Sequence, residues 1–220
     1  MLKLYKGMRI AFFEEIYQNY SELDFTHLTD RSLGMAGIES RFAELFGRAR
    51  HGILDDIRER SYLRRSLLWR RADLTKDMIK IDYPADRRVL SWSWMAVTGS
   101  ICFMDVPFGA VDWQPDLGSP FDDYGTPGAL LGDARDFDKQ ENDRVFFDRS
   151  PDDDWFSYSL LKCVVLGMQD RSNGSLLTHY GLLVAAAETG SDVYERVGVA
   201  AFERDQTWMD QELIQRIRVI

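Results

Sequence analysis

Apolar residues recur at helical spacing through the first third of the chain. A short helix is predicted from Ala11 to Tyr20, because apolar residues three and four positions apart share one helix face. That face is formed by Phe12, Phe13, Ile16 and Tyr17. A polar connector follows between residues 21 and 28.

A second helix is predicted to begin at Asp30, whose carboxylate is suited to accept a bond from a free amide of the first turn. Gly47 is expected to end it. Its apolar face comprises Met35, Ile38, Phe42 and Leu45. Apolar residues between Ile53 and Trp69 predict further helical turns, so residues 1–77 are expected to form a helical segment.

From Met78 onward, short apolar runs alternate with turn residues, which is typical of strands. Three successive runs predict an antiparallel meander, with a possible edge strand at the end of the sequence. The runs are Tyr158–Met168, Leu176–Ala187 and Val193–Phe202, the turns are 170–174 and 188–192, and the edge strand is Gln215–Ile220. The fold class is therefore predicted as α+β, with the helical N-terminal third packed on a mostly antiparallel sheet, either a sandwich or a partly open barrel.

The stretch from Val89 to Phe108 contains two tryptophans two residues apart. In an extended strand this spacing places Trp92 and Trp94 on the same face. Thr98 and Gly99 break the run, and Ile101–Val106 is predicted to return as a second strand. Two rings on one face can anchor a core or form a ligand platform. We predict a core, because aromatic side chains bury large apolar areas.

An acidic segment between Asp112 and Asp154 interrupts the predicted β domain of residues 78–220. The net charge of the chain is −9, and this segment supplies all of it, with 13 acidic residues against four basic ones. It is also rich in Pro and Gly and long for a connection, so a surface loop excursion over 112–154 is expected. Despite this excursion, the helical segment and the β domain are predicted to form one compact unit.

Composition indicates a globular intracellular protein. Of the 220 residues, 45% are hydrophobic and 13% aromatic, and no apolar run approaches the roughly 18 residues that span a bilayer. The first ten residues lack the apolar region of a secretory signal, and two cysteines suit a reducing compartment. We expect a cytoplasmic protein without membrane association.

Strong chemical motifs are missing from the sequence. It has no phosphate loop, dinucleotide fingerprint, His-Glu-x-x-His or Cys-x-x-Cys pattern. A calcium-loop start at Asp136 fails at its sixth and twelfth positions, where Glu141 and Phe147 stand. Cys102 and Cys163 lie in apolar runs that favour buried, inert thiols. We therefore predict no catalytic residue, no cofactor and no metal, and favour a protein that is not an enzyme.

Two surfaces are candidates for interaction. A helix over Arg58–Arg71 is predicted to present an arginine cluster, and the loop acids are expected to be solvated. The candidate residues are Arg64, Arg65, Arg70, Arg71, Asp152, Asp153 and Asp154. Protein binding is favoured over nucleic-acid binding because the net negative charge repels phosphates. A hydrolase that uses carboxylates of the acidic segment beside a tryptophan platform is the alternative, and nucleic-acid binding is the weaker one.

An ordered series of short motifs resembles the region downstream of the incompatibility domain in fungal heterokaryon-incompatibility proteins. The motifs are Leu28–Arg31, Met35–Ile38, Arg41–Ala43, Ser66–Arg70, Ser91–Ala96, Asp105–Gly109, Leu161–Gly167 and Tyr194–Val199. The motifs of the incompatibility domain have no counterpart here, so the resemblance transfers no catalytic residue. It implies a non-enzymatic accessory module that acts through protein contacts in non-self recognition.

Overall fold

The protein, described by a computed structural model over residues 2–56, 59–123, 125–150, 160–170, 176–187, 192–209 and 214–220, forms two compact units. The N-terminal unit is Met1–Gly109 and the C-terminal unit is Ala110–Ile220. Helices and antiparallel sheets together confirm the α+β class. The predicted single unit and the predicted boundary after residue 77 are corrected, because Val89, Trp94 and Ile101 share one core with the N-terminal helices.

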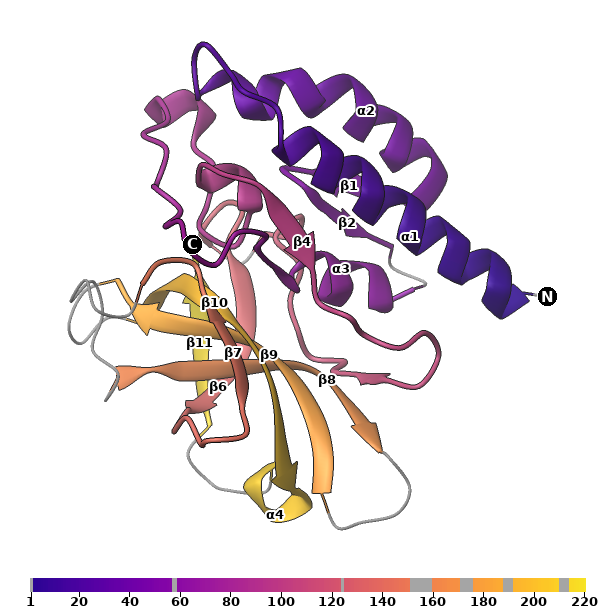
Figure 1. Cartoon of the computed structure of the whole chain (residues 1–220), viewed down its shortest axis with the longest axis vertical. Coiled ribbons are helices and arrows are strands. Elements are labelled where there is room, and N and C mark those ends of the chain that lie inside the picture. The colour runs from indigo at the N-terminus through magenta and orange to yellow at the C-terminus, as the bar shows by residue number, and fades with distance from the viewer. Residues whose placement is uncertain are drawn as a thin grey trace. The chain divides into compact units, whose positions relative to one another are not determined.

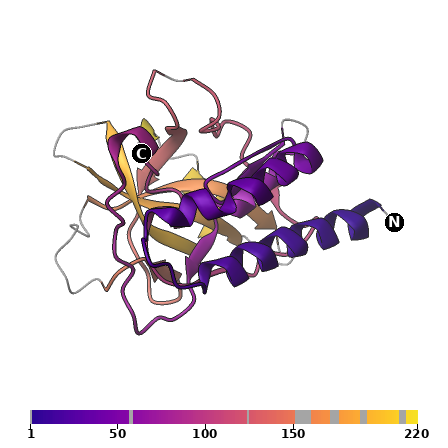
Figure 2. The ribbon, with the colours of Figure 1, turned by 90° about the horizontal axis from the view of Figure 1, so that it is seen from above.

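Two antiparallel helices, α1 (Leu2–Ser21) and α2 (Asp30–Phe46), lie side by side in the N-terminal unit (Figures 1 and 2). The Phe12 and Phe42 rings meet edge to face with centroids 6.4 Å apart. The helix α2 begins at the predicted Asp30 and ends before the predicted Gly47, whose φ of 113° favours glycine.

The buried face of α2 differs from the predicted one. Ile38 and Leu45 are exposed. The buried face of α2 comprises polar as well as apolar residues, namely Arg31, Ser32, Met35, Glu39, Phe42 and Phe46. Glu39 is accommodated because its Oε1 accepts a hydrogen bond from the Gly52 amide at 2.6 Å.

The helical turns predicted between Ile53 and Trp69 are confirmed only over Ser61–Ser66, because strands occupy both ends of this stretch. Strands β1 (Arg48–Arg50) and β2 (Ile53–Asp55) are joined by His51 and Gly52, both with positive φ, as a two-residue hairpin turn requires. Helix α3 (Ser61–Ser66) spans only six residues, and strand β3 (Trp69–Arg71) follows it.

The two tryptophans of the central stretch are both in the interior, 3% and 0% exposed, which confirms the predicted core. The predicted strand pair is wrong. Trp94–Ala96 form a 3-10 turn, η2, and strand β4 (Ile101–Phe103) pairs with β3 instead. A second 3-10 turn, η1, spans Ala85–Arg87. The Trp94 Nε1 donates to the Gly52 carbonyl at 3.2 Å, so the core partner of this stretch is the hairpin turn.

The C-terminal unit contains a closed five-stranded barrel, in the order β11-β6-β8-β9-β10 with β10 returning to β11. Its strands are β6 (Leu130–Asp136), β8 (Lys162–Asp170), β9 (Leu176–Ala186), β10 (Val193–Asp205) and β11 (Gln215–Val219). The antiparallel pairs β8–β9 and β9–β10 confirm the predicted meander. The final strand exists as predicted but is not an edge, because it pairs with both β6 and β10.

The barrel closes through a parallel pair. Alternating strand directions close a ring only when the number of strands is even, so a ring of five needs at least one parallel contact. That contact joins Val193 and Tyr194 of β10 to Arg218 and Val219 of β11. The short helix α4 (Gln206–Met209) begins the connection between these strands.

The predicted loop excursion over 112–154 is also corrected. It contains β6 and two further strands, β5 (Asp112–Trp113) on β8 and β7 (Arg144–Phe147) on β10. Two of its acids are docked on β10 rather than solvated, and the remaining predicted acids, Asp152–Asp154, lie outside the described residues. The docked pairs are Asp148 with Arg196 and Asp143 with Arg204.

Candidate functional site

A pocket with a volume of about 400 Å³ lies wholly within the N-terminal unit. Three segments form its walls. They are the connection between α1 and α2 from Ser21 to Arg31, the loop after β3 from Arg71 to Met78, and the turn Thr98–Ser100 before β4.

Hydrogen bonds fasten these three segments to one another. The Ser21 Oγ accepts from the Ile101 amide at 2.9 Å, which joins the end of α1 to the start of β4. The Thr98 amide donates to the Ile79 carbonyl at 2.8 Å, and the Ile79 amide returns a bond to the Thr98 Oγ1 at 3.1 Å. These bonds, two of which are accepted by the side-chain hydroxyls of Ser21 and Thr98, fix the walls of the pocket, as is typical of preformed binding sites.

A buried arginine from the first turn of α2 lines this pocket. Arg31 is 2% exposed. One guanidinium nitrogen donates to the Gly99 carbonyl at 2.7 Å, and the guanidinium carbon lies 5.0 Å from the Trp94 ring centroid. Burial lowers the pKa of Arg31 to about 10, so its charge is still present at neutral pH.

The backbone around Arg31 is fixed by the preceding helix. The Tyr20 hydroxyl donates to the Arg31 carbonyl at 2.8 Å. Gly34 permits this approach, because a Cβ at that position would overlap the Tyr20 hydroxyl. The end of α1 therefore sets the position from which Arg31 extends.

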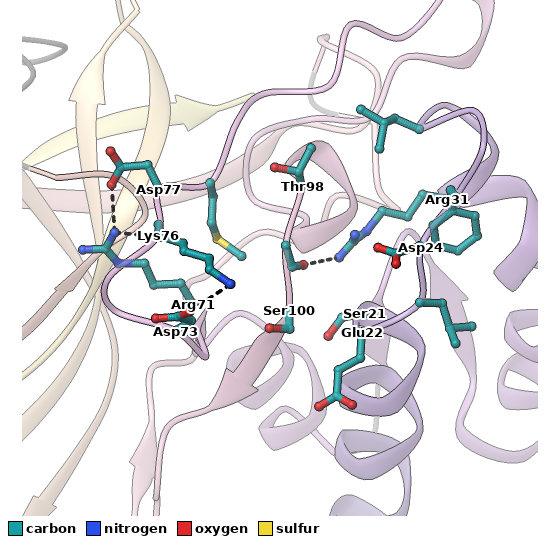
Figure 3. Close-up of a pocket in the computed structure, with 15 residues that line it drawn as sticks. Ser21, Glu22, Asp24, Arg31, Arg71, Asp73, Lys76, Asp77, Thr98 and Ser100 are labelled. Atoms are coloured by element: carbon teal, nitrogen blue, oxygen red, sulfur yellow. Dashed lines mark hydrogen bonds and ion pairs between the residues drawn. The ribbon is translucent and has the colours of Figure 1, made fainter.

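Charged residues on the loop after β3 form the opposite side of the pocket (Figure 3). Arg71 pairs with Asp77 at 2.9 Å, and Lys76 pairs with Asp73 at 3.4 Å. Hydrogen bonds from Thr75 hold the pKa of Asp73 below its usual range. The charges on this side therefore compensate one another.

Two exposed aliphatic side chains line the pocket. They are Leu23 and Leu28, which are 54% and 47% exposed. We call Leu23 and Leu28 the aliphatic rim.

A smaller pocket of about 230 Å³ lies in the C-terminal unit and contains two acids of the acidic segment, Asp116 and Asp133. Asp133 is paired with Arg216 at 2.9 Å. The hydrolase hypothesis drew its platform from Trp92, Trp94 and Trp113. Trp92 and Trp94 are buried in the N-terminal unit, whereas Trp113 is half-buried on β5 of the C-terminal unit.

The arginines predicted as an interaction surface are separated by the structure. Arg64 and Arg65 are buried, which corrects their predicted exposure. Arg65 donates to the carbonyls of Val106 at 3.0 Å and Pro107 at 2.8 Å. Arg70 and Arg71 lie on β3 and are half-buried, so the described residues form no continuous arginine helix over 58–71.

Thiols and imidazoles add no further site among the described residues. Burial raises the pKa of the Cys102 and Cys163 thiols and lowers the pKa of His51 and His179 to about 4. His179 is stacked on Phe202 with centroids 5.3 Å apart, as part of an aromatic cluster. Within the described ranges, no group of three or more His, Cys, Asp or Glu residues is placed to hold a metal ion.

Arg31 is not among the functional residues predicted from the sequence. A signal was present, because Arg31, Met35, Phe42 and Phe46 are spaced by four, seven and four positions and so share a helix face. An arginine aligned with core residues indicates a buried charge, and buried charges need compensation.

Comparisons of this chain with protein-family models, with curated proteins and with solved structures found no match. None of the helices in the described part of the chain has the length and apolar character needed to cross a membrane.

Proposed function

We propose that this protein is a non-enzymatic recognition module that binds a partner protein at the pocket of its N-terminal unit. The observation that supports this is the aliphatic rim around a polar, preformed pocket. Apolar side chains left in water beside a concave polar site are typical of protein-binding surfaces, where an apolar contact area surrounds a few specific polar contacts.

The aliphatic rim is suited to binding because its leucine side chains are exposed to solvent and are not packed in the core. Leu23 and Leu28 follow α1 in a connection whose polar neighbours Glu22 and Asp24 are also exposed. Burying a leucine side chain contributes about 1.5–3 kcal/mol. A partner that covers these two leucines therefore gains substantial free energy at the pocket entrance.

Capture experiments with matched variants test the proposal. We would immobilise the full chain and collect bound proteins from an extract of the source organism, using wild type, the double variant Leu23→Asp/Leu28→Asp and the control Leu33→Asp/Leu45→Asp. The control leucines are equally exposed but lie on α2 outside the pocket. We expect partners that the control retains and the rim variant loses. A partner set unchanged by the rim variant, or lost only in the control, would refute binding at the pocket.

The biological setting is a finer proposal that rests on the motif series alone. A cytoplasmic role in fungal non-self recognition, as in the C-terminal half of heterokaryon-incompatibility proteins, would place the partner among proteins that differ between strains. The predicted packing of the helical segment on the β domain is a separate proposal that rests on the apolar pattern of the sequence, and binding at the pocket does not depend on it. Capture from two incompatible strains tests this setting, and identical partners from both would contradict it.

A further inference from the structure

We propose that Arg31 makes this pocket a receptor for a peptide carboxylate, either the chain terminus or an Asp or Glu side chain of the partner. This inference rests on the proposed function and adds to it the chemical group that the partner must supply. The feature that supports it is the position of Arg31, whose guanidinium is buried, lines the pocket and bonds a backbone carbonyl.

The charge of Arg31 is buried without an anionic partner among the residues that the structure describes. Its guanidinium bonds the Gly99 carbonyl and faces the Trp94 ring, and its Nε has no hydrogen-bond partner among the described residues. No carboxylate of the described chain lies within ion-pair distance of it. Buried charges are normally paired, because desolvation of an ion costs several kcal/mol. A pocket beside such a charge offers the space in which an anion can supply the missing pair.

The other charges of the pocket limit what that anion can be. Arg71 and Lys76 are already neutralised by Asp77 and Asp73. Glu22 and Asp24 add two exposed negative charges at the entrance. A phosphate carries nearly two negative charges and would be repelled by these acids, with Arg31 as its single uncompensated cation. A carboxylate carries one charge and matches the planar donors of one guanidinium.

The rim identifies the rest of the ligand as a peptide. A free small carboxylate would leave Leu23 and Leu28 in water, whereas apolar side chains next to the carboxylate would cover them. Glu22 and Asp24 would at the same time favour a basic residue further along the partner chain. The expected ligand is therefore a peptide with a carboxylate flanked by aliphatic residues.

Asp24 lines the same pocket, so its carboxylate is an alternative to the ligand carboxylate as a partner for Arg31. If a movement of the connection brought Asp24 onto Arg31, the pocket would be closed by an ion pair of its own. The variant Asp24→Asn separates the two cases. Under our proposal this variant binds acidic peptides as tightly as wild type or more tightly, since one repelling charge is gone.

The test uses the full chain and three arrays of synthetic hexapeptides with aliphatic flanking residues. The first array ends in a free carboxylate without internal acids, the second is the same set amidated, and the third is amidated with an internal Asp or Glu. We expect the first or third array to bind about 10- to 100-fold more tightly than the second, the range for loss of charge-assisted hydrogen bonds. Which of the two binds distinguishes the terminal carboxylate from the side chain.

Protein variants complete the design. Arg31→Gln is expected to abolish the difference between the arrays, while the rim variant weakens all three. Because Arg31→Gln can disturb folding, the comparison of free and amidated peptides on wild-type protein decides the inference without it. Equal binding of all three arrays refutes recognition of a carboxylate but does not contradict the proposed function. Absence of binding in every array refutes both. Loss of acidic-peptide binding in Asp24→Asn also refutes the inference.

Discussion

Buried arginines of the two units have different kinds of hydrogen-bond partner. In the C-terminal unit, Arg196 is completely buried and makes a bidentate pair with Asp148 at 2.9 and 3.1 Å. Arg204 does the same with Asp143 at 2.9 and 2.8 Å. In the N-terminal unit, Arg31 is just as deeply buried but bonds a backbone carbonyl beside a pocket.

This difference separates structural charge from charge available to a ligand. The pairs of Arg196 and Arg204 fasten the acidic segment onto β10, and their charges are cancelled inside the fold. Arg31 fastens α2 to the Gly99 turn with one bond and retains its charge. Burial alone therefore does not identify an arginine that is available to a ligand, and Arg31 is distinguished by lining a pocket as well.

The largest effect is expected from breaking one bidentate pair. Arg196→Met leaves the Asp148 carboxylate buried and unpaired, which is expected to cost about 3–5 kcal/mol. Urea unfolding, with hydrogen exchange in β10 as the local probe, measures the loss. The double variant Arg196→Met/Asp148→Leu is expected to recover most of it. A single variant as stable as wild type would show that the pair does not hold the acidic segment.

A backbone substitution tests the irregular core of the N-terminal unit. Gly52→Ala places a Cβ against the Trp94 indole at a φ of 79°, and overlap together with strain is expected to cost about 2–4 kcal/mol. The control is Gly37→Ala on α2, where no atom lies within 4 Å and alanine is expected to stabilise by about 0.5–1 kcal/mol. Thermal unfolding compares them, and equal midpoints would exclude the close approach of the hairpin turn to Trp94.

Removal of Arg31 is expected to destabilise the protein less than removal of Arg196. Arg31→Met leaves the Gly99 carbonyl without its donor, and no carboxylate loses a partner, so the cost is about 1–2 kcal/mol. Urea unfolding with hydrogen exchange in β4 provides the measurement. A cost equal to that of Arg196→Met would remove the distinction between the two arginines.

The smallest effect is expected from a substitution of Glu14, a carboxyl group of the N-terminal unit that is only partly compensated by a nearby positive charge. Burial raises the pKa of Glu14 to about 7, and the nearby Arg65 opposes the rise only in part. The folded state then holds a proton that the unfolded state releases above about pH 4.5, so the contribution of Glu14 to stability is greatest below pH 4.5 and is lost as pH rises through 7.

Glu14→Gln is therefore expected to stabilise the protein at pH 8 by on the order of 1 kcal/mol, a value reduced for the partial exposure of the side chain. At pH 4.5 the variant and wild type are expected to match. Unfolding free energies measured from pH 4.5 to 8 give the comparison, and a difference that does not change with pH would contradict the raised pKa.

The sequence predicts the positions of helices and strands better than it predicts which of them pack or pair with one another. The meander is predictable because its apolar runs are separated by turn residues, and α2 because its caps and period agree. The stretch around Trp92 and Trp94 is not, since a two-residue spacing fits a strand as well as a turn, and its hydrogen-bond partner Gly52 lies 42 residues away.

The acidic residues of the segment 112–154 prevented strand β6 of the barrel from being predicted. Strand β6 alternates buried and half-buried residues from Leu130 to Arg135, but its acids made it resemble part of a solvated loop. The acids Asp143 and Asp148 gave no local sign of their arginine partners on β10, which come 61 and 48 residues later. The pocket could be predicted only through Arg31, whose helical spacing places it among core residues.

The late position of β11 in the sequence has a consequence for how the chain is made. Asp133 of β6 leaves the ribosome 83 residues before Arg216 of β11, its partner on the neighbouring strand. During that interval the meander can form, but the free edge of β6 offers unpaired amides and carbonyls to any nearby strand. A β11 strand from a neighbouring nascent copy satisfies the same hydrogen bonds, so crowded polysomes favour exchange of this strand between copies. Slow emergence of isolated chains favours the closed monomeric barrel.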